Sequence, residues 1–208
     1  KLKSVLGKAS KSTTEAKPSN LVIKIPNSTG ELDDFKVQES SILEPDYQAK
    51  HPELRTYIGQ NIKNPSSIIR FSITQKGFHG IVLSSKTGTQ FIDPYTQDNT
   101  YVVYNKGDLP ELKEAYKCHL PERFTTEKET DEGSKSFKNP GDSKLRTFRL
   151  ALASTVEYSE FHWKAAGLED GDTEADKKEA VLDAMVVTMH RVNSVFQKDL
   201  AALMTMVD

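Results

Sequence analysis

Hydrophobic and polar positions alternate with a period of two through much of the first half of the chain. Residues 67–74 alternate best, residues 78–84 return as their partner, and Gly77 lies in the turn between them. This pattern predicts a β-hairpin. Further short runs rich in β-branched and aromatic residues predict strands at 21–25, 35–37, 55–59, 89–93 and 101–104. The pattern therefore predicts an antiparallel β-rich region over residues 20–118, with a short helical turn between Pro45 and Pro52.

Two segments lack any such pattern. Residues 1–19 are rich in Lys, Ser and Thr, which predicts a disordered leader. Residues 119–144 include a run from Thr125 to Ser136 without an apolar residue, which is typical of an exposed linker and of sites where proteases cut. The expected cleavage region contains the basic residues Lys135, Lys138 and Lys144.

The last part of the chain, residues 145–208, has the pattern of a strand, a helix and a second strand. Residues 145–153 predict the first strand, and residues 200–207 predict a second, buried strand. Between them, Thr173 with Asp176 resembles a capping box, and an apolar stripe of helical spacing predicts a helix over 174–197. The short connections indicate a βαβ unit with parallel strands.

A single βαβ unit is expected to be incomplete. One helix covers only one face of a parallel sheet, and two strands leave both sheet edges bare. We therefore expect further residues of the gene product, or another chain, to complete this sheet. The chain begins with Lys1 rather than Met, which indicates a processed or trimmed product. The expected fold class is α+β, an antiparallel β-rich region followed by the incomplete βαβ start of an α/β domain.

Composition narrows the range of partners. The 208 residues carry a net charge of −2, so the chain has no basic excess with which to bind nucleic acid or an anionic membrane surface. No apolar run approaches the roughly 18 residues that cross a bilayer. Cys118 is the single cysteine and cannot form a disulfide within the chain, so cysteine usage leaves the redox compartment open.

Several stretches resemble one family of enzymes. The stretch LRTFRLALASTVEY at 145–158, and ADKKEAVLDAMVVTMHRVNSVFQKDLAALMTMV at 175–207, resemble the start of the catalytic domain of bacterial reprolysin-like zinc metallopeptidases, which are metzincins. The stretches SSILEPDYQAKHPELRTYIGQNI, IRFSITQKGFHGIVLSS and FIDPY resemble the pro-region of the same family. The resemblance covers about residues 20–105 and 145–208.

The resemblance implies a function for the parent protein. That protein would be a secreted zinc endopeptidase, made as a zymogen whose pro-region assists folding and keeps the enzyme latent. The zinc would be held by an HExxHxxGxxH motif, with the Glu as general base. The present sequence contains no HExxH, and no two of its five histidines are four residues apart. We therefore expect no catalytic residue and no bound zinc in this chain, whose partner would be the remainder of its own catalytic domain.

Cys118 has two interpretations. Thiolate is a favoured zinc ligand, and a pro-region thiolate placed on the catalytic zinc would keep a zymogen inactive. The position of Cys118 just before the linker suits such a cysteine switch, although the sequence around it lacks the glycine of the known switch motif. The simpler interpretation is an unpaired, surface or half-buried cysteine.

Other candidate residues have a plain and a functional interpretation. The acidic cluster at 169–172 is either a calcium site or the lead-in to the following helix, whose N-terminus favours negative charge. His162 and Trp163 are expected in a loop or surface groove, His190 at a packed or solvent-facing helix position, and the four methionines in the core.

Two alternatives to the zymogen fragment stay open. In one, the chain is a secreted β-rich adhesion or carbohydrate-type binding module without enzymatic activity. In the other, two copies of the fragment complete each other's sheet as a dimer. An HExxH motif in the codons that follow would separate the first alternative from the peptidase.

Overall fold

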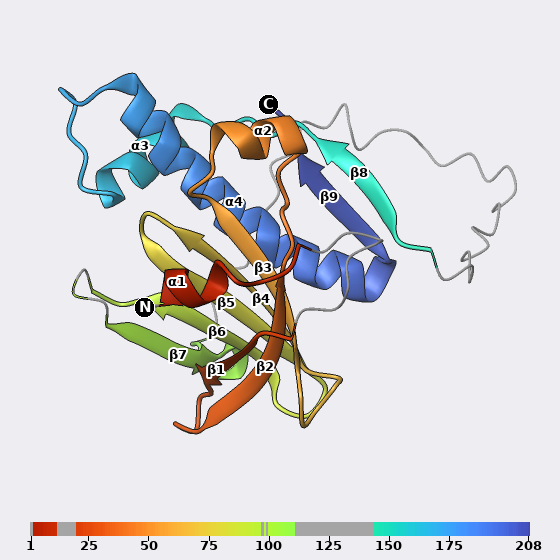
Figure 1. The fold of residues 1–208 in the computed structure, drawn as a ribbon. Coiled ribbons are helices and arrows are strands. Elements are labelled where there is room, and N and C mark those ends of the chain that lie inside the picture. Colours follow the sequence, from red (N-terminus) through yellow and green to blue (C-terminus); the bar gives the residue numbers. More distant parts are fainter. Residues whose placement is uncertain (1, 12–19, 97, 99, 111–143) are drawn as a thin grey trace, which may run out of the picture. The chain divides into compact units, whose positions relative to one another are not determined.

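The computed structural model describes residues 2–11, 20–96, 98, 100–110 and 144–208 (Figure 1). Residues 1–108 and 145–208 form one compact unit, and residues 109–144 form a second. Every helix and strand that the structure describes belongs to the first unit. The fold class is α+β, which confirms the coarse expectation.

Within the described residues, an antiparallel sheet of seven strands follows the order of the chain from one edge to the other. The strands are β1 (Val22–Pro26), β2 (Leu32–Glu39), β3 (Arg55–Asn61), β4 (Ile68–Thr74), β5 (Gly77–Ser84), β6 (Gly88–Pro94) and β7 (Tyr101–Asn105). Each of the seven predicted strands is confirmed, and each strand pairs with the next one along the chain.

The turn between β4 and β5 shows why Gly77 is needed there. Thr74 pairs with Gly77, so the hairpin loop consists of only two residues. Gly77 has a φ of 114°, which side-chain-bearing residues rarely adopt, and a Cβ at this position would lie 2.7 Å from the hydroxyl oxygen of Tyr101. The predicted glycine turn is therefore confirmed, and the reason is both conformational and steric.

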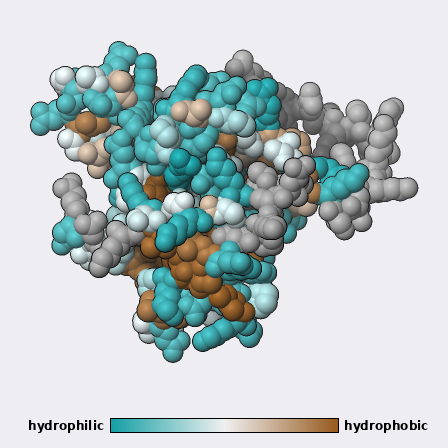
Figure 2. Space-filling view, viewed as in Figure 1, coloured by the Kyte–Doolittle hydropathy of each residue, from teal (hydrophilic) through white to brown (hydrophobic). Residues whose placement is uncertain are grey.

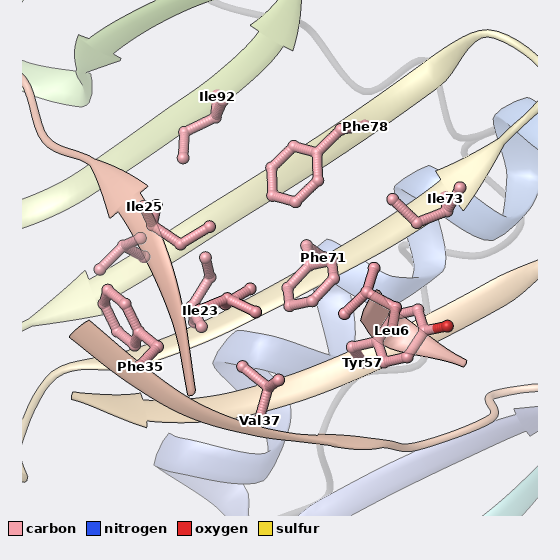
Figure 3. Packing of buried hydrophobic residues seen from close by; sticks show 12 residues of the cluster. Leu6, Ile23, Ile25, Phe35, Val37, Tyr57, Phe71, Ile73, Phe78 and Ile92 are labelled. Carbon is pink, nitrogen blue, oxygen red and sulfur yellow. The ribbon is translucent and has the colours of Figure 1, made fainter. Parts of the chain in front are cut away.

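The sheet curls around an apolar core (Figure 3). Tyr57, Phe71 and Phe78 stack in a row across β3, β4 and β5, with ring centroids 4.9 and 5.0 Å apart. Helix α1 (Leu2–Leu6) adds Leu6, which is only 1% exposed. Figure 2 shows hydrophobic residues gathered over the curled sheet, whereas the surface of the helices in the same view is mainly hydrophilic.

The predicted βαβ unit is confirmed. Strand β8 (Arg146–Leu150) and strand β9 (Ala202–Met206) pair in parallel, and helix α4 (Glu174–Leu200) connects them. Thr173 caps α4 by accepting a hydrogen bond from the backbone N–H of Asp176, as the capping box predicts. The helix ends where Ala201 adopts a left-handed conformation, three residues later than predicted.

Helix α4 lies between the two sheets (Figure 1). One stripe of the helix packs in a second apolar core with β8, β9 and residues 42–54, and the neighbouring stripe contacts β4 and β5. The apolar stripe consists of Leu182, Val186 and Met189. Met189 and Met206 are buried, and Met185 and Met204 pack against the same core, so the prediction of core methionines is confirmed.

Three expectations from the sequence need correction. The leader was expected to be disordered, but residues 2–6 form α1, because burial of Leu6 against the sheet stabilises a turn of helix that has no pattern of its own. His162 and Trp163 were expected in a loop or a surface groove; they lie in helix α3 (Val156–Ala165), which Thr155 caps, so the loop is wrong, whereas Trp163 does line a surface pocket with residues 168–171. The β-rich region and the βαβ unit were treated as separate parts, whereas α4 joins them in one compact unit.

The predicted helical turn after Pro45 is confirmed as helix α2 (Pro45–Lys50), and a short 3-10 helix, η1 (Lys106–Asp108), follows β7. Proline suits the first position of α2, because its missing N–H would have no partner within the helix. Helix α2 follows directly on residues 42–44, which contribute to the candidate site.

Candidate functional site

A short segment of the antiparallel region pairs with strand β9 of the parallel sheet. We call residues 42–44 the lent segment. The N–H of Met206 donates to the carbonyl of Ile42 at 2.7 Å, and the N–H of Glu44 donates to the carbonyl of Met206 at 2.9 Å. Leu43 and Met206 form a parallel bridge. The lent segment therefore covers the edge of β9 that β8 leaves open.

Side chains fix the lent segment at this edge. Ile42 and Leu43 are buried in the apolar core beneath α4. The guanidinium of Arg149, on β8, contacts both carboxylate oxygens of Glu44 at 2.9 and 3.2 Å, so an ion pair joins the lent segment to β8 across β9. The hydroxyl of Ser41 accepts a hydrogen bond from the N–H of Leu43 at 3.0 Å, which holds the turn into α2.

A buried asparagine anchors β9 to α4. The side-chain amide of Asn193 donates to the carbonyl of Met204, and its amide oxygen accepts from the N–H of Met204, both at 2.8 Å. Asn193 has no exposed surface. Both backbone groups of Met204 are thereby satisfied by one side chain, which fixes the register between helix and strand.

The contact between α4 and the antiparallel sheet is unusually polar. We call it the polar interface, and it comprises Arg70, Asp93, Asp183, His190 and Arg191. Asp93 is its hub: one carboxylate oxygen lies 2.9 Å from Nδ1 of His79 and 2.5 Å from the guanidinium of Arg191, and the other accepts from the hydroxyl of Tyr104 at 3.0 Å. Burial opposes ionisation of Asp93, but the hydrogen bond from His79 and the charge of Arg191 outweigh it and hold its pKa below the ordinary value.

Four members of the polar interface have a buried side-chain nitrogen or oxygen without a hydrogen-bond partner among the described residues: Arg70, Asp183, His190 and Arg191. Asp183 accepts from the N–H of Gln75 at 3.0 Å, but its other oxygen has no partner among the described residues, and burial raises its pKa to about 6. His190 is buried with Nε2 unpartnered within the same residues. Burial and the charges of Arg70 and Arg191 lower the pKa of His190 well below its usual value, so it is neutral in the folded protein.

Unsatisfied buried polar atoms weaken a contact. Each one costs about 1–3 kcal/mol relative to a fully hydrogen-bonded group. The apolar core beneath α4 has no such penalty, since its contacts are between hydrocarbon side chains. Helix α4 thus makes an apolar contact with β9 and the lent segment, and a polar contact with the curled sheet. The polar contact stabilises the helix less, because its buried polar atoms are partly unsatisfied.

Most of the candidate residues chosen from the sequence do not come together. Cys118, Lys135 and Lys138 lie outside the described residues, and Lys144 is exposed two residues before β8. His162 lies on α3 and His190 in the polar interface. In the acidic cluster, the N–H of Glu169 donates to the carboxylate of Asp172 at 2.7 Å, as expected for a turn that leads into α4.

The zinc that the resemblance implies for the parent protein was not expected to bind to this chain. Among the described residues, no group of three or more His, Cys, Asp or Glu side chains could hold a metal ion. We assign no step of a zinc mechanism to them.

No helix in the described ranges is long and apolar enough to span a membrane.

A pro-region that adds a strand to a sheet edge of the catalytic domain was one possibility considered from the sequence, but residues 42–44, Asn193 and the polar interface were not identified. Arg70, Asp93 and Arg191 come from two strands and a helix that are far apart in the chain, so no local spacing connects them. The one available signal was the presence of charged residues inside elements with clear apolar stripes.

In comparisons with known proteins, no protein-family model, no curated protein and no solved structure matches this chain.

Proposed function

We propose that the chain is the pro-region and the opening of the catalytic domain of a secreted, zinc-dependent endopeptidase zymogen. In this proposal the antiparallel region assists folding of the catalytic domain and keeps it latent until the linker is cut. The single observation that carries the proposal is the lent segment, because it is a part of the antiparallel region that pairs with one edge of the parallel sheet. The sequence resemblance supplies the chemical class.

The lent segment gives the antiparallel region a physical role in folding. A two-stranded parallel sheet buries little apolar surface and leaves backbone groups unpaired at both edges. Residues 42–44 pair with one edge and bury Ile42 and Leu43 beside Val186 of α4. A pro-region that supplies these contacts would stabilise the first βαβ unit before the rest of the catalytic domain has folded.

The other edge of the parallel sheet suits a further strand of the catalytic domain. Strand β8 pairs only with β9 among the strands that the structure describes. Phe148, near its middle, is 53% exposed, and Leu145 and Leu152 at its ends are also exposed. An additional parallel strand and a covering element would bury these apolar side chains.

The intact gene product, a deletion variant of it and its cleaved form test the proposal. Deletion of residues 20–106 should leave the catalytic domain insoluble or inactive, because β9 loses the lent segment at one of its edges. Cleavage within residues 119–144 of the intact protein should increase its peptidase activity, because latency ends. A gene product that folds and cleaves peptides equally well without residues 20–106 would refute the folding role. A gene product without any peptidase activity would refute the chemical class and favour a binding module.

A further inference from the structure

A pocket of about 310 Å³ lies between the antiparallel sheet and the C-terminal part of α4. Its walls include the apolar side chains of Ile58, Ile68 and Leu83. Arg70 and Lys198 also line it, and no acidic residue does so within the described ranges. A volume of this size is at the lower end for pockets that bind small molecules, about 300 Å³. The pocket thus combines apolar walls with two cations.

Arg70 is the unusual member of this pocket. Its side chain is 97% removed from solvent, since the residue is 3% exposed. One guanidinium nitrogen donates to the amide oxygen of Gln197, and the nitrogen Nη1 has no hydrogen-bond partner among the described residues. Burial lowers the pKa of Arg70 only to about 10, so the group stays charged at neutral pH.

A buried guanidinium is normally matched by an anion. Buried charges are costly unless they are paired, and a carboxylate accepts from guanidinium more strongly than a neutral amide does. Gln197 is such a neutral amide, and it is a partly exposed residue of the pocket lining, so a ligand can replace it. Most of the remaining wall is apolar, which favours an anion that carries an apolar group over inorganic phosphate, which has none.

We propose that this pocket binds a monocarboxylate with a short branched apolar group. The carboxylate replaces Gln197 as the acceptor on Arg70 and contacts Lys198, and the apolar group lies against Ile58, Ile68 and Leu83. Two sources share this chemistry, a free short-chain acid and the C-terminal residue of a peptide. The proposal concerns the chain as it stands and does not depend on the peptidase function.

Titration of the isotope-labelled chain with 3-methylbutanoate, followed by NMR, tests the site. We expect saturable shifts at Arg70 and at Ser194, which also lines the pocket. The carboxamide 3-methylbutanamide, which has the same shape without charge, should cause no saturable shift. Acetyl-Ala-Leu with a free C-terminal carboxylate and its carboxamide form the second pair of probes. Binding of both acids identifies a chain end as a ligand, and binding of 3-methylbutanoate alone identifies a free acid.

Two lysine variants of equal charge provide the control. Lys198→Glu places an acid in the pocket and should weaken binding of the carboxylate by about tenfold or more. Lys178→Glu changes the net charge equally on the same helix, but Lys178 is exposed and pairs with Glu174 outside the pocket, so affinity should not change. Equal binding of acid and amide, or equal weakening by both variants, would overturn the proposal. Equally tight binding of inorganic phosphate would also overturn it.

Discussion

Replacement of Glu44 by proline removes one backbone hydrogen bond of the lent segment together with the ion pair to Arg149. Glu44 has a φ of −59° and a ψ of 149°, which proline adopts without strain. The preceding Leu43 takes part in a β-bridge and is therefore extended, as a residue before proline prefers to be. What proline cannot supply is the N–H that donates to the carbonyl of Met206 at 2.9 Å.

The expected loss of stability follows from the burial of the acceptor. Met206 is 2% exposed, so water does not readily replace the lost donor. Leaving a buried acceptor unsatisfied costs about 1–3 kcal/mol. Proline also restricts the unfolded chain, which offsets the cost by about 0.4–1 kcal/mol. The free energy of unfolding of Glu44→Pro should therefore be about 1–2 kcal/mol lower than that of a control variant that keeps the N–H of residue 44.

Glu44→Ala is that control. It removes the ion pair with Arg149, whose side chain is 72% exposed, and such an exposed pair contributes about 0–1 kcal/mol. Urea denaturation, followed by circular dichroism and by fluorescence of the single tryptophan on α3, gives the free energy of unfolding of each variant. Hydrogen exchange at the amide of Met206 should accelerate in Glu44→Pro alone. Equal stability of the two variants, with unchanged exchange, would refute the role of the lent segment.

Three further predictions concern the polar interface. A double-mutant cycle of Asp93→Asn and Arg191→Met should give a coupling energy of about 1–2 kcal/mol, because both side chains are mostly buried; additive effects would contradict the ion pair. Asp183 has a pKa of about 6 in the folded protein and 3.8 in the unfolded chain, because burial disfavours its charged form. Its contribution to the free energy of unfolding is therefore present below pH 4 and is lost as the pH rises through 6. Asp183→Asn should therefore stabilise the protein by about 1–3 kcal/mol above pH 7, with no gain near pH 4, as urea titrations at several pH values would show. The pKa of His190 is lowered, so the dependence on pH is the reverse: its contribution to the free energy of unfolding is present above pH 6.5 and is lost as the pH falls. The variant His190→Gln should therefore lose less stability than the wild type during acid denaturation. An unchanged loss would argue against a buried neutral histidine.

The sequence was informative where structure depends on neighbours in the chain. The seven antiparallel strands were predictable because each pairs with the next, so a period of two and a turn residue suffice. Helix α4 was predictable for a similar reason, since Thr173 and a long apolar stripe are local signals. The parallel pairing of β8 and β9 followed from the length of the connection between them.

The remainder depends on contacts between distant residues. Helix α3 has no buried residue, so it lacks an apolar stripe, and Thr155 was its only local signal. Alternation along β4 suggests one apolar face and one solvated face. In the structure Arg70, Ser72 and Thr74 on the second face are buried as well, because α4 lies over them. The candidate site was therefore hidden in positions that look like ordinary surface in the sequence.

The zinc content and chemistry of the intact gene product test the central claim most directly. We expect one zinc ion per molecule of the intact gene product, and we expect cleavage of a peptide substrate that a zinc chelator abolishes and added zinc restores. An intact gene product that binds no zinc and cleaves no peptide, even after its linker has been cut, would contradict the claim.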